Sequence, residues 1–173
     1  AKQTGFTIVE LLIVIVVIAI LASISIVAYN GIQNRAADSS VQSDLKNIGN
    51  KIRQNGILDK PYPTNRGDFV TAIEGMTVNK NSYGAHYTPT SPNGEYNLLF
   101  CFYTPSSGSS DVDIRLVAAS KSGKVFQYDT ADGAGVKEYA GNMVTNTTLC
   151  PARANYTPVR VWIYSGSTWP TGI

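Results

Sequence analysis

The chain has 173 residues, a formal net charge of +2 and only 15% charged residues. This length leaves room for one folded domain together with an apolar segment of membrane size. The small net charge indicates neither a nucleic-acid partner nor an anionic surface as the binding partner. The information on function lies instead in how apolar and polar residues are divided along the chain.

The first distinctive segment is an apolar run near the N-terminus. Residues 11–34 contain no charged side chain. About 20 apolar residues in a helix span the ~30 Å hydrocarbon layer of a membrane. One carboxylate, Glu10, stands at the beginning of this run. Because an ionised carboxylate near the hydrocarbon layer costs on the order of 2–3 kcal/mol, Glu10 requires a partner or a function.

Two simple interpretations of the run leave Glu10 unexplained. A secretory signal peptide would have a basic region where Glu10 stands, and an apolar stretch of only about 7–15 residues. A plain membrane anchor accounts for the length of the run but gives the carboxylate no role. A third interpretation comes from the residues on either side of Glu10.

Residues 5–12, GFTIVELL, resemble the N-terminal signature of the type IV pilins and related pseudopilins. The resemblance is specific over residues 5–30. In that family a peptidase cleaves after a Gly, the new N-terminal Phe is usually N-methylated, and a Glu lies at the fifth mature position. The resemblance therefore implies a leader at residues 1–5, cleavage and methylation at Gly5 and Phe6, and a subunit-assembly role for Glu10.

By the same resemblance, the partner of Glu10 is the α-amine of a neighbouring copy. A carboxylate and an amine about 4 Å apart attract each other by roughly 4 kcal/mol at an effective dielectric near 20. This attraction is comparable with the cost of placing Glu10 near the hydrocarbon layer. The sequence departs from the family at Val27, where many members have a Pro that kinks the helix.

An amphipathic helix is predicted at residues 30–55, continuous with the apolar helix at residues 6–29. Its end is predicted at Asn55 and Gly56, since Gly favours a helix C-cap. Apolar residues recur in it at steps of three or four, which places them on one face. These residues are Ala37, Val41, Leu45, Ile48 and Ile52. We expect this face to pack against a globular head formed by residues 56–173.

The head is predicted to be rich in strands. Residues 57–94 are expected to be mainly loop, with one short helix near residues 68–74. Strands are expected at 95–104, 112–116, 125–128 and 160–164, with a hairpin turn at 121–124. Strands that follow one long helix favour an antiparallel sheet packed on that helix. The predicted fold class is therefore α+β, which is also the pilin-like architecture that the resemblance implies.

Two cysteines, Cys101 and Cys150, both lie in the head. If the apolar segment delivers the head outside the membrane, they meet an oxidising environment and form a disulfide. Closing a loop of about 50 residues would stabilise the head by roughly 4 kcal/mol in the chain-entropy treatment. The alternative is a pair of reduced, buried thiols.

Candidate metal and catalytic residues are few. Asp129 and Asp132 lie in a Gly-rich segment and are a weak calcium candidate, without the spacing of an EF-hand. Asp and Gly are also ordinary turn residues. His86 is the single histidine, so neither a zinc site nor a serine triad is indicated. We expect no enzymatic activity, no metal and no cofactor.

The resemblance implies a structural subunit of a type IV pilus. Such a subunit is inserted in the cytoplasmic membrane before assembly and lies in an extracellular fibre afterwards, where it serves adhesion, twitching motility or DNA uptake. Its partners would be copies of itself, a prepilin peptidase and the assembly machinery. Two alternatives remain: a pseudopilin of a secretion or competence system, and a membrane-anchored extracellular binding module that does not polymerise.

Overall fold

Helix α1 occupies Ile8–Ile57 and is the longest element of the chain. The structure, a computed structural model, describes residues 5, 7–58, 62–84, 87–88, 91–95, 97–105, 112–133, 135–140 and 150–162. At residues 87–88, 91–95, 105 and 157–162 it describes the backbone alone. The chain forms two compact units, residues 1–35 and residues 36–173, and α1 contributes to both.

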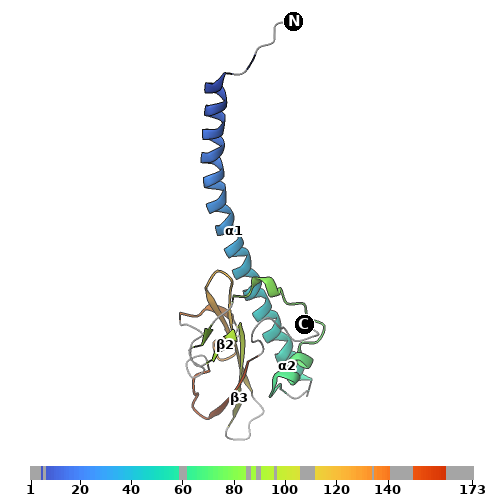
Figure 1. The fold of residues 1–173 in the computed structure, drawn as a ribbon. Helices are drawn as coiled ribbons and strands as arrows, with labels where there is room; N and C mark the ends of the chain where they lie inside the picture. The colour runs from blue at the N-terminus through green and yellow to red at the C-terminus, as the bar shows by residue number, and fades with distance from the viewer. Residues whose placement is uncertain are drawn as a thin grey trace. The chain divides into compact units, whose positions relative to one another are not determined.

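The second unit contains a five-stranded antiparallel sheet. Its strand order is β6-β5-β4-β3-β7. The bounds are β3 Leu98–Pro105, β4 Asp113–Ala119, β5 Val125–Asp129, β6 Gly135–Glu138 and β7 Tyr156–Trp162. Two short helices precede the sheet in the chain: α2 (Arg66–Ala72) and the 3-10 helix η1 (Lys80–Ser82). They are followed by a separate pair of strands, β1 (Tyr87–Thr88) and β2 (Ser91–Glu95). The C-terminal part of α1 and α2 lie side by side next to the sheet (Figure 1). The predicted α+β fold class is confirmed.

The apolar face predicted for the amphipathic part of α1 is also confirmed. All five predicted residues are buried, and Val41, Leu45, Ile48 and Ile52 are fully so. They belong to one core with the side chains that β3 and β4 direct toward the helix, including Phe100, Phe102, Ile114 and Leu116. Alternate residues of a strand point to opposite faces, which explains why every second residue of β3 belongs to this core.

The opposite face of the sheet is buried as well over parts of β3, β4 and β5, which the sequence analysis did not predict. Leu99, Cys101 and Tyr103 of β3 are fully buried and form a second core. Val117, Ala119, Val125 and Cys150 complete it, with Tyr139 and Tyr156 packed at its border. Residues 98–103 of β3 are therefore all apolar, because both faces of the strand are covered there.

Several predicted boundaries were wrong by a few residues. Helix α1 begins at Ile8 rather than at residue 6 and ends at Ile57, while α2 begins two residues before the predicted short helix. Strand β7 begins at Tyr156, four residues earlier than expected, and residues 163–164 lie outside the described residues.

Some elements were missed altogether. The segment expected to be mainly loop also contains η1, β1 and β2, and β6 follows the Gly-rich segment. Strands β2 and β6 carry little apolar alternation, so their pairing with neighbouring strands rather than their composition defines them.

Polar contacts fix the amphipathic part of α1 to the head. The Asp44 carboxylate accepts hydrogen bonds from the Tyr83 hydroxyl at 3.1 Å and from the Asn79 backbone N–H at 3.2 Å. The Asn55 side-chain amide donates to the carbonyl of Ala72 in α2 at 2.7 Å. Because hydrogen bonds are directional, these contacts fix the position of α1 along the core, which apolar packing alone does not specify.

Candidate functional site

The candidate processing site lies where the chain enters α1. Gly5 is exposed and stands outside the helix, which begins at Ile8. Phe6 lies outside the described residues. Thr7 is the residue that directly precedes the helix. The segment from Gly5 to Thr7 therefore includes the predicted cleavage position and precedes the first helical turn.

Thr7 and Glu10 form a capping box at the start of α1. The Thr7 backbone N–H and hydroxyl donate to Glu10 Oε2 at 2.8 and 2.7 Å, and the Glu10 N–H donates to Thr7 Oγ1 at 3.3 Å. This reciprocal arrangement satisfies backbone groups that the first helical turn leaves without partners. It explains why α1 begins two residues later than predicted. The Thr-x-x-Glu spacing was readable in the sequence, and the sequence analysis missed it.

The capping box gives Glu10 a partner within its own chain. The carboxylate that the resemblance assigns to assembly thus contacts Thr7 in the single chain. Its other oxygen, Oε1, has no hydrogen bond among the described residues.

After Glu10, the first unit presents an apolar helix surface on all sides. Every large apolar side chain from Ile8 to Ile32 is between 48% and 81% exposed in the single chain. Two hydroxyls in this stretch are satisfied internally: Ser23 donates to the Ile20 carbonyl at 2.7 Å and Ser25 to the Leu21 carbonyl at 2.8 Å. By length and composition, α1 is a helix that could cross a membrane. Such a surface requires lipid or other protein around it.

The predicted disulfide is present in the head. Cys101 of β3 and Cys150 are joined, with Cα atoms 5.7 Å apart and a separation of 49 residues in the chain. Both cysteines are fully buried in the second core. The bond fixes the segment that precedes β7 against the outer face of the sheet.

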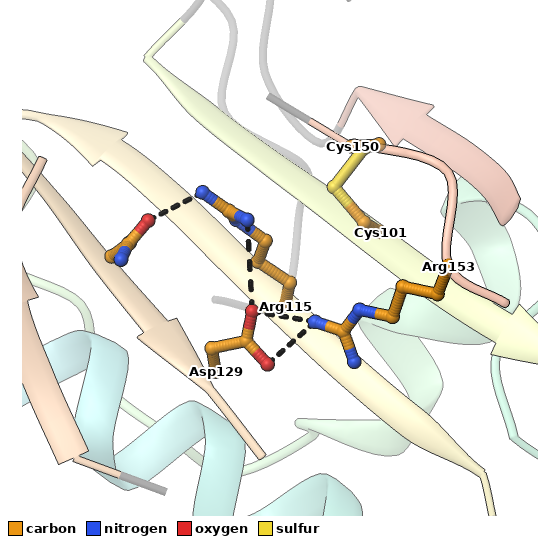
Figure 2. The surroundings of a disulfide bond; sticks show 6 residues. Cys101, Arg115, Asp129, Cys150 and Arg153 are labelled. Atoms are coloured by element: carbon orange, nitrogen blue, oxygen red, sulfur yellow. Dashed lines mark hydrogen bonds and ion pairs between the residues drawn. A yellow bond between two sulfur atoms is a disulfide. The ribbon is translucent and has the colours of Figure 1, made fainter. Parts of the chain in front are cut away.

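An ionic cluster lies beside the disulfide (Figure 2). Arg153 Nη2 donates to both oxygens of Asp129 at 2.6 and 2.5 Å, and its Nη1 donates to Asp113 at 2.9 Å. The same guanidinium lies over the ring of Tyr103, 3.9 Å from its centre. Arg115 approaches Asp129 from the other side, with 3.7 Å between Nη1 and Oδ2. Burial acts to lower the pKa of Arg153, and the hydrogen bond and charge of Asp129 outweigh it, so the pKa is raised and the side chain stays charged.

The calcium candidate has cationic partners in this structure. The Asp129 carboxylate binds two guanidinium groups, and Asp132 lies 3.7 Å from the Lys137 ammonium. Within the described part of the chain, no group of three or more His, Cys, Asp or Glu residues gathers to hold a metal ion. His86 lies outside the described residues. Calcium at Asp129 and Asp132 stays an untested prediction, and the geometry offers an alternative role for Asp129.

Comparison with known proteins bears on the N-terminal segment and on most of the chain. The family model described as "Prokaryotic N-terminal methylation motif" matches residues 1–26. The resemblance to the type IV pilins and pseudopilins is thereby confirmed. The chain is also 28% identical over 128 residues to the type II secretion system core protein G of Escherichia coli (strain K12), an alignment that covers 64% of this pilin-like chain and 88% of that protein. No solved structure matches the chain.

Proposed function

We propose that this pilin-like chain is a non-enzymatic filament subunit of the type IV pilus class, which polymerises through its N-terminal helix. The observation that supports this proposal most strongly is the exposed apolar surface from Ile8 to Ile32, which follows directly on the methylation motif. In the membrane, lipid would cover this surface. In the filament, the same surface of other copies would replace the lipid. The head, residues 56–173, would face outward.

Three residues near the N-terminus have roles in this proposal: Gly5, Phe6 and Glu10. A prepilin peptidase cleaves between Gly5 and Phe6, which removes residues 1–5 and frees the α-amine of Phe6. Glu10 of one copy then pairs with that amine of its neighbour. The pair offsets the cost of an apolar environment for both charges and fixes the register between copies.

A pseudopilin of a secretion system is the second candidate. The similarity to the secretion core protein G of E. coli supports it. The two candidates share the helix, the motif and the filament, and they differ in where the filament ends. A pilus extends from the cell surface and serves adhesion, twitching motility or DNA uptake, whereas a pseudopilin filament serves secretion. Shearing of intact cells separates them, because only a surface pilus is released in quantity.

The capping box allows a test that separates the two roles of Glu10. Glu10→Gln keeps the capping box, because Gln also completes this motif, but it removes the charge. Thr7→Val is the matched control, because it removes both hydrogen bonds of the capping hydroxyl and leaves the charge of Glu10. We expect Glu10→Gln to abolish filaments while the chain remains in the membrane, and Thr7→Val to weaken the helix start by about 1 kcal/mol with filaments retained.

Filament yield in the sheared fraction and the amount of chain in the membrane are measured together. Wild-type filament yield from Glu10→Gln would contradict the assembly role and leave Glu10 as a helix cap. Loss of filaments from both variants would mean that assembly needs the cap as well as the charge. A membrane-anchored module that does not polymerise would give no filaments from any of the chains, wild type included.

A further inference from the structure

A cleft between α1 and α2 is used by none of the roles assigned so far. Its volume is about 410 Å³, within the range of pockets that accept a ligand or a partner side chain. Lys51 and Asn55 line it from α1. The remaining lining residues belong to the connection and to the region of α2: Tyr62, Asp68, Thr71, Ala72 and Glu74.

The charges in this cleft are unevenly matched. The Asp68 carboxylate already has hydrogen-bond partners at the start of α2: it accepts from the Thr64 hydroxyl at 2.8 Å and from the Asn65 amide at 2.9 Å. The Glu74 carboxylate is exposed and has no ion pair or hydrogen bond among the described residues, and neither has the Lys51 ammonium. Two carboxylates against one ammonium leave an excess of negative charge, so the cleft favours a cationic occupant.

Helix α1 carries a cationic surface, formed by Lys46 and Arg53, on a side other than the one that lines the cleft. Lys46 and Arg53 lie seven residues, or two turns, apart and are both exposed. Neither has an ion pair or hydrogen bond within the part of the chain that the structure describes. Arg53 precedes Asn55 by two residues, which is about 200° around an α-helix, and Asn55 faces α2. The pair Lys46 and Arg53 therefore points away from the cleft of its own chain.

We propose that Arg53, flanked by Lys46, docks on the cleft of a second copy of this chain and pairs there with Glu74. This inference rests on the proposed function, because it requires that copies polymerise. The two surfaces are different, so the contact is heterologous, and each copy gives one surface and receives on the other. Such a contact repeats from copy to copy, and it forms an open filament when the rotation between copies does not close a ring. A guanidinium matches a carboxylate in two parallel hydrogen bonds, which suits Arg53 to this position.

The contact contributes register and specificity. Exposed charge pairs add little net affinity, and they select the orientation in which two surfaces meet. The apolar part of α1 would supply the affinity between copies. Pairing of Arg53 with Glu74 would then restrict the orientation of each head relative to the head of the next copy.

Cross-linking of mixed copies tests the contact directly. Both native cysteines are in the Cys101–Cys150 disulfide, so a new cysteine is the single free thiol of its chain. Cells that express Arg53→Cys together with Glu74→Cys are treated with a bifunctional thiol-reactive cross-linker, because an arginine–carboxylate pair holds its two Cα atoms too far apart for a direct disulfide. Their filaments are then analysed by denaturing electrophoresis. We expect a 53–74 dimer from the mixture, a ladder of longer products from the double variant, and monomers from each single variant alone.

Each outcome of this experiment has a defined meaning. Filaments without a 53–74 cross-link overturn the contact and leave the proposed function intact. Cross-links of 53 with 53 or of 74 with 74 contradict a heterologous contact. Absence of the wild-type chain from the filament fraction overturns the proposed function and this inference with it.

Charge reversal provides an independent measurement. Arg53→Glu and Glu74→Arg should each lower filament yield severalfold, because each places like charges opposite one another at the contact, which costs more than loss of the pair. The double variant should restore the yield, because the pair is then rebuilt in the opposite sense. Lys121→Glu is the matched control, since it makes a lysine-to-glutamate change at an exposed position outside both surfaces. Failure of the double variant to restore the yield would overturn the pairing.

Discussion

At the scale of single residues, the guanidinium of Arg153 connects three parts of the head. It binds Asp113 of β4 and Asp129 of β5 and lies over Tyr103 of β3. The side chain of Arg153 is 15% exposed and that of Asp129 5% exposed. The cluster thus holds the segment after Cys150 on the sheet through charge as well as through the disulfide.

Removal of this guanidinium should destabilise the head. Arg153→Ala leaves the buried Asp129 and the partly buried Asp113 with fewer cationic partners, and we expect a loss of roughly 3 kcal/mol in the free energy of unfolding. Arg153→Lys should lose less, because an ammonium keeps the charge but cannot bridge both carboxylates in the same way. Urea unfolding of the full chain in detergent micelles measures both. A loss below about 0.5 kcal/mol for Arg153→Ala would show that the cluster contributes little to stability.

Asp44 should make stability depend on pH. Burial raises the pKa of Asp44 above 3.8, although hydrogen bonds from Tyr83 and Asn79 act in the opposite direction. Ionisation of Asp44 therefore costs more in the folded than in the unfolded chain. The free energy of unfolding should fall as the pH rises from 3.8 through the pKa of the folded state, and it should stay lower above it.

Asp44→Asn removes this charge and keeps an oxygen that accepts from Tyr83. We expect the variant to be modestly more stable than wild type at neutral pH, with the gain absent below about pH 3.8, where Asp44 is protonated in both states. The free energies of unfolding of both chains, measured at neutral pH and below about pH 3.8, test this prediction. Lower stability of the variant at neutral pH would contradict the sign of the effect.

At the scale of elements, Gly49 shows how closely α1 approaches the sheet. A Cβ built at Gly49 would lie 2.3 Å from the ring of Tyr128 in β5. Gly is unfavourable in a helix interior by about 1 kcal/mol relative to Ala. Close packing of Tyr128 against the helix backbone explains why a glycine stands here.

Gly49→Ala should therefore destabilise the chain although it improves helix propensity. The expected loss is about 1–3 kcal/mol, which is typical of overpacking in a core. Gly31→Ala in the same helix is the matched control. Apart from the backbone of its own helix, no atom of the described residues lies within 4 Å of a Cβ built at Gly31, so this variant should be neutral or slightly more stable. Equal stability changes in the two variants, measured by urea unfolding, would contradict the account of Gly49.

The elements differ in how far the sequence could predict them. The buried face of α1 was predictable residue by residue, because a 3.6-residue period persists from Ala37 to Ile52 and one side of the helix is buried. The start of α1 was misplaced because the Thr7–Glu10 capping box was overlooked. Strand β6 was missed because its four residues include Lys137 and Glu138, which are exposed, and its position depends on pairing with β5.

At the scale of the whole molecule, burial of the second face of the sheet could not be read from local pattern. It depends on two contacts between residues far apart in the sequence. These are the disulfide between Cys101 and Cys150, separated by 49 residues, and the ion pair between Arg153 and Asp129, separated by 24 residues. The cysteine count predicted the covalent link, but nothing in the spacing of residues assigned Arg153 its partners. Likewise, the sequence identified Glu10 as a candidate for assembly, whereas the capping role of the same carboxylate was overlooked although its Thr-x-x-Glu spacing was readable.

The first unit and the head serve different parts of one proposed life cycle. The apolar part of α1 exposes a surface that needs lipid or protein around it, and the head has a core on each face of its sheet. This division is consistent with the proposed passage of the chain from a membrane into a filament. We propose that cleavage after Gly5 frees the α-amine of Phe6 and that copies then assemble through Glu10.

The mass of the N-terminal peptide from filaments sheared off intact cells tests this claim most directly. We expect a peptide that begins at N-methylated Phe6 and contains Glu10. A peptide from the same filaments that begins at Ala1 would contradict cleavage after Gly5 and would remove the amine proposed to pair with Glu10.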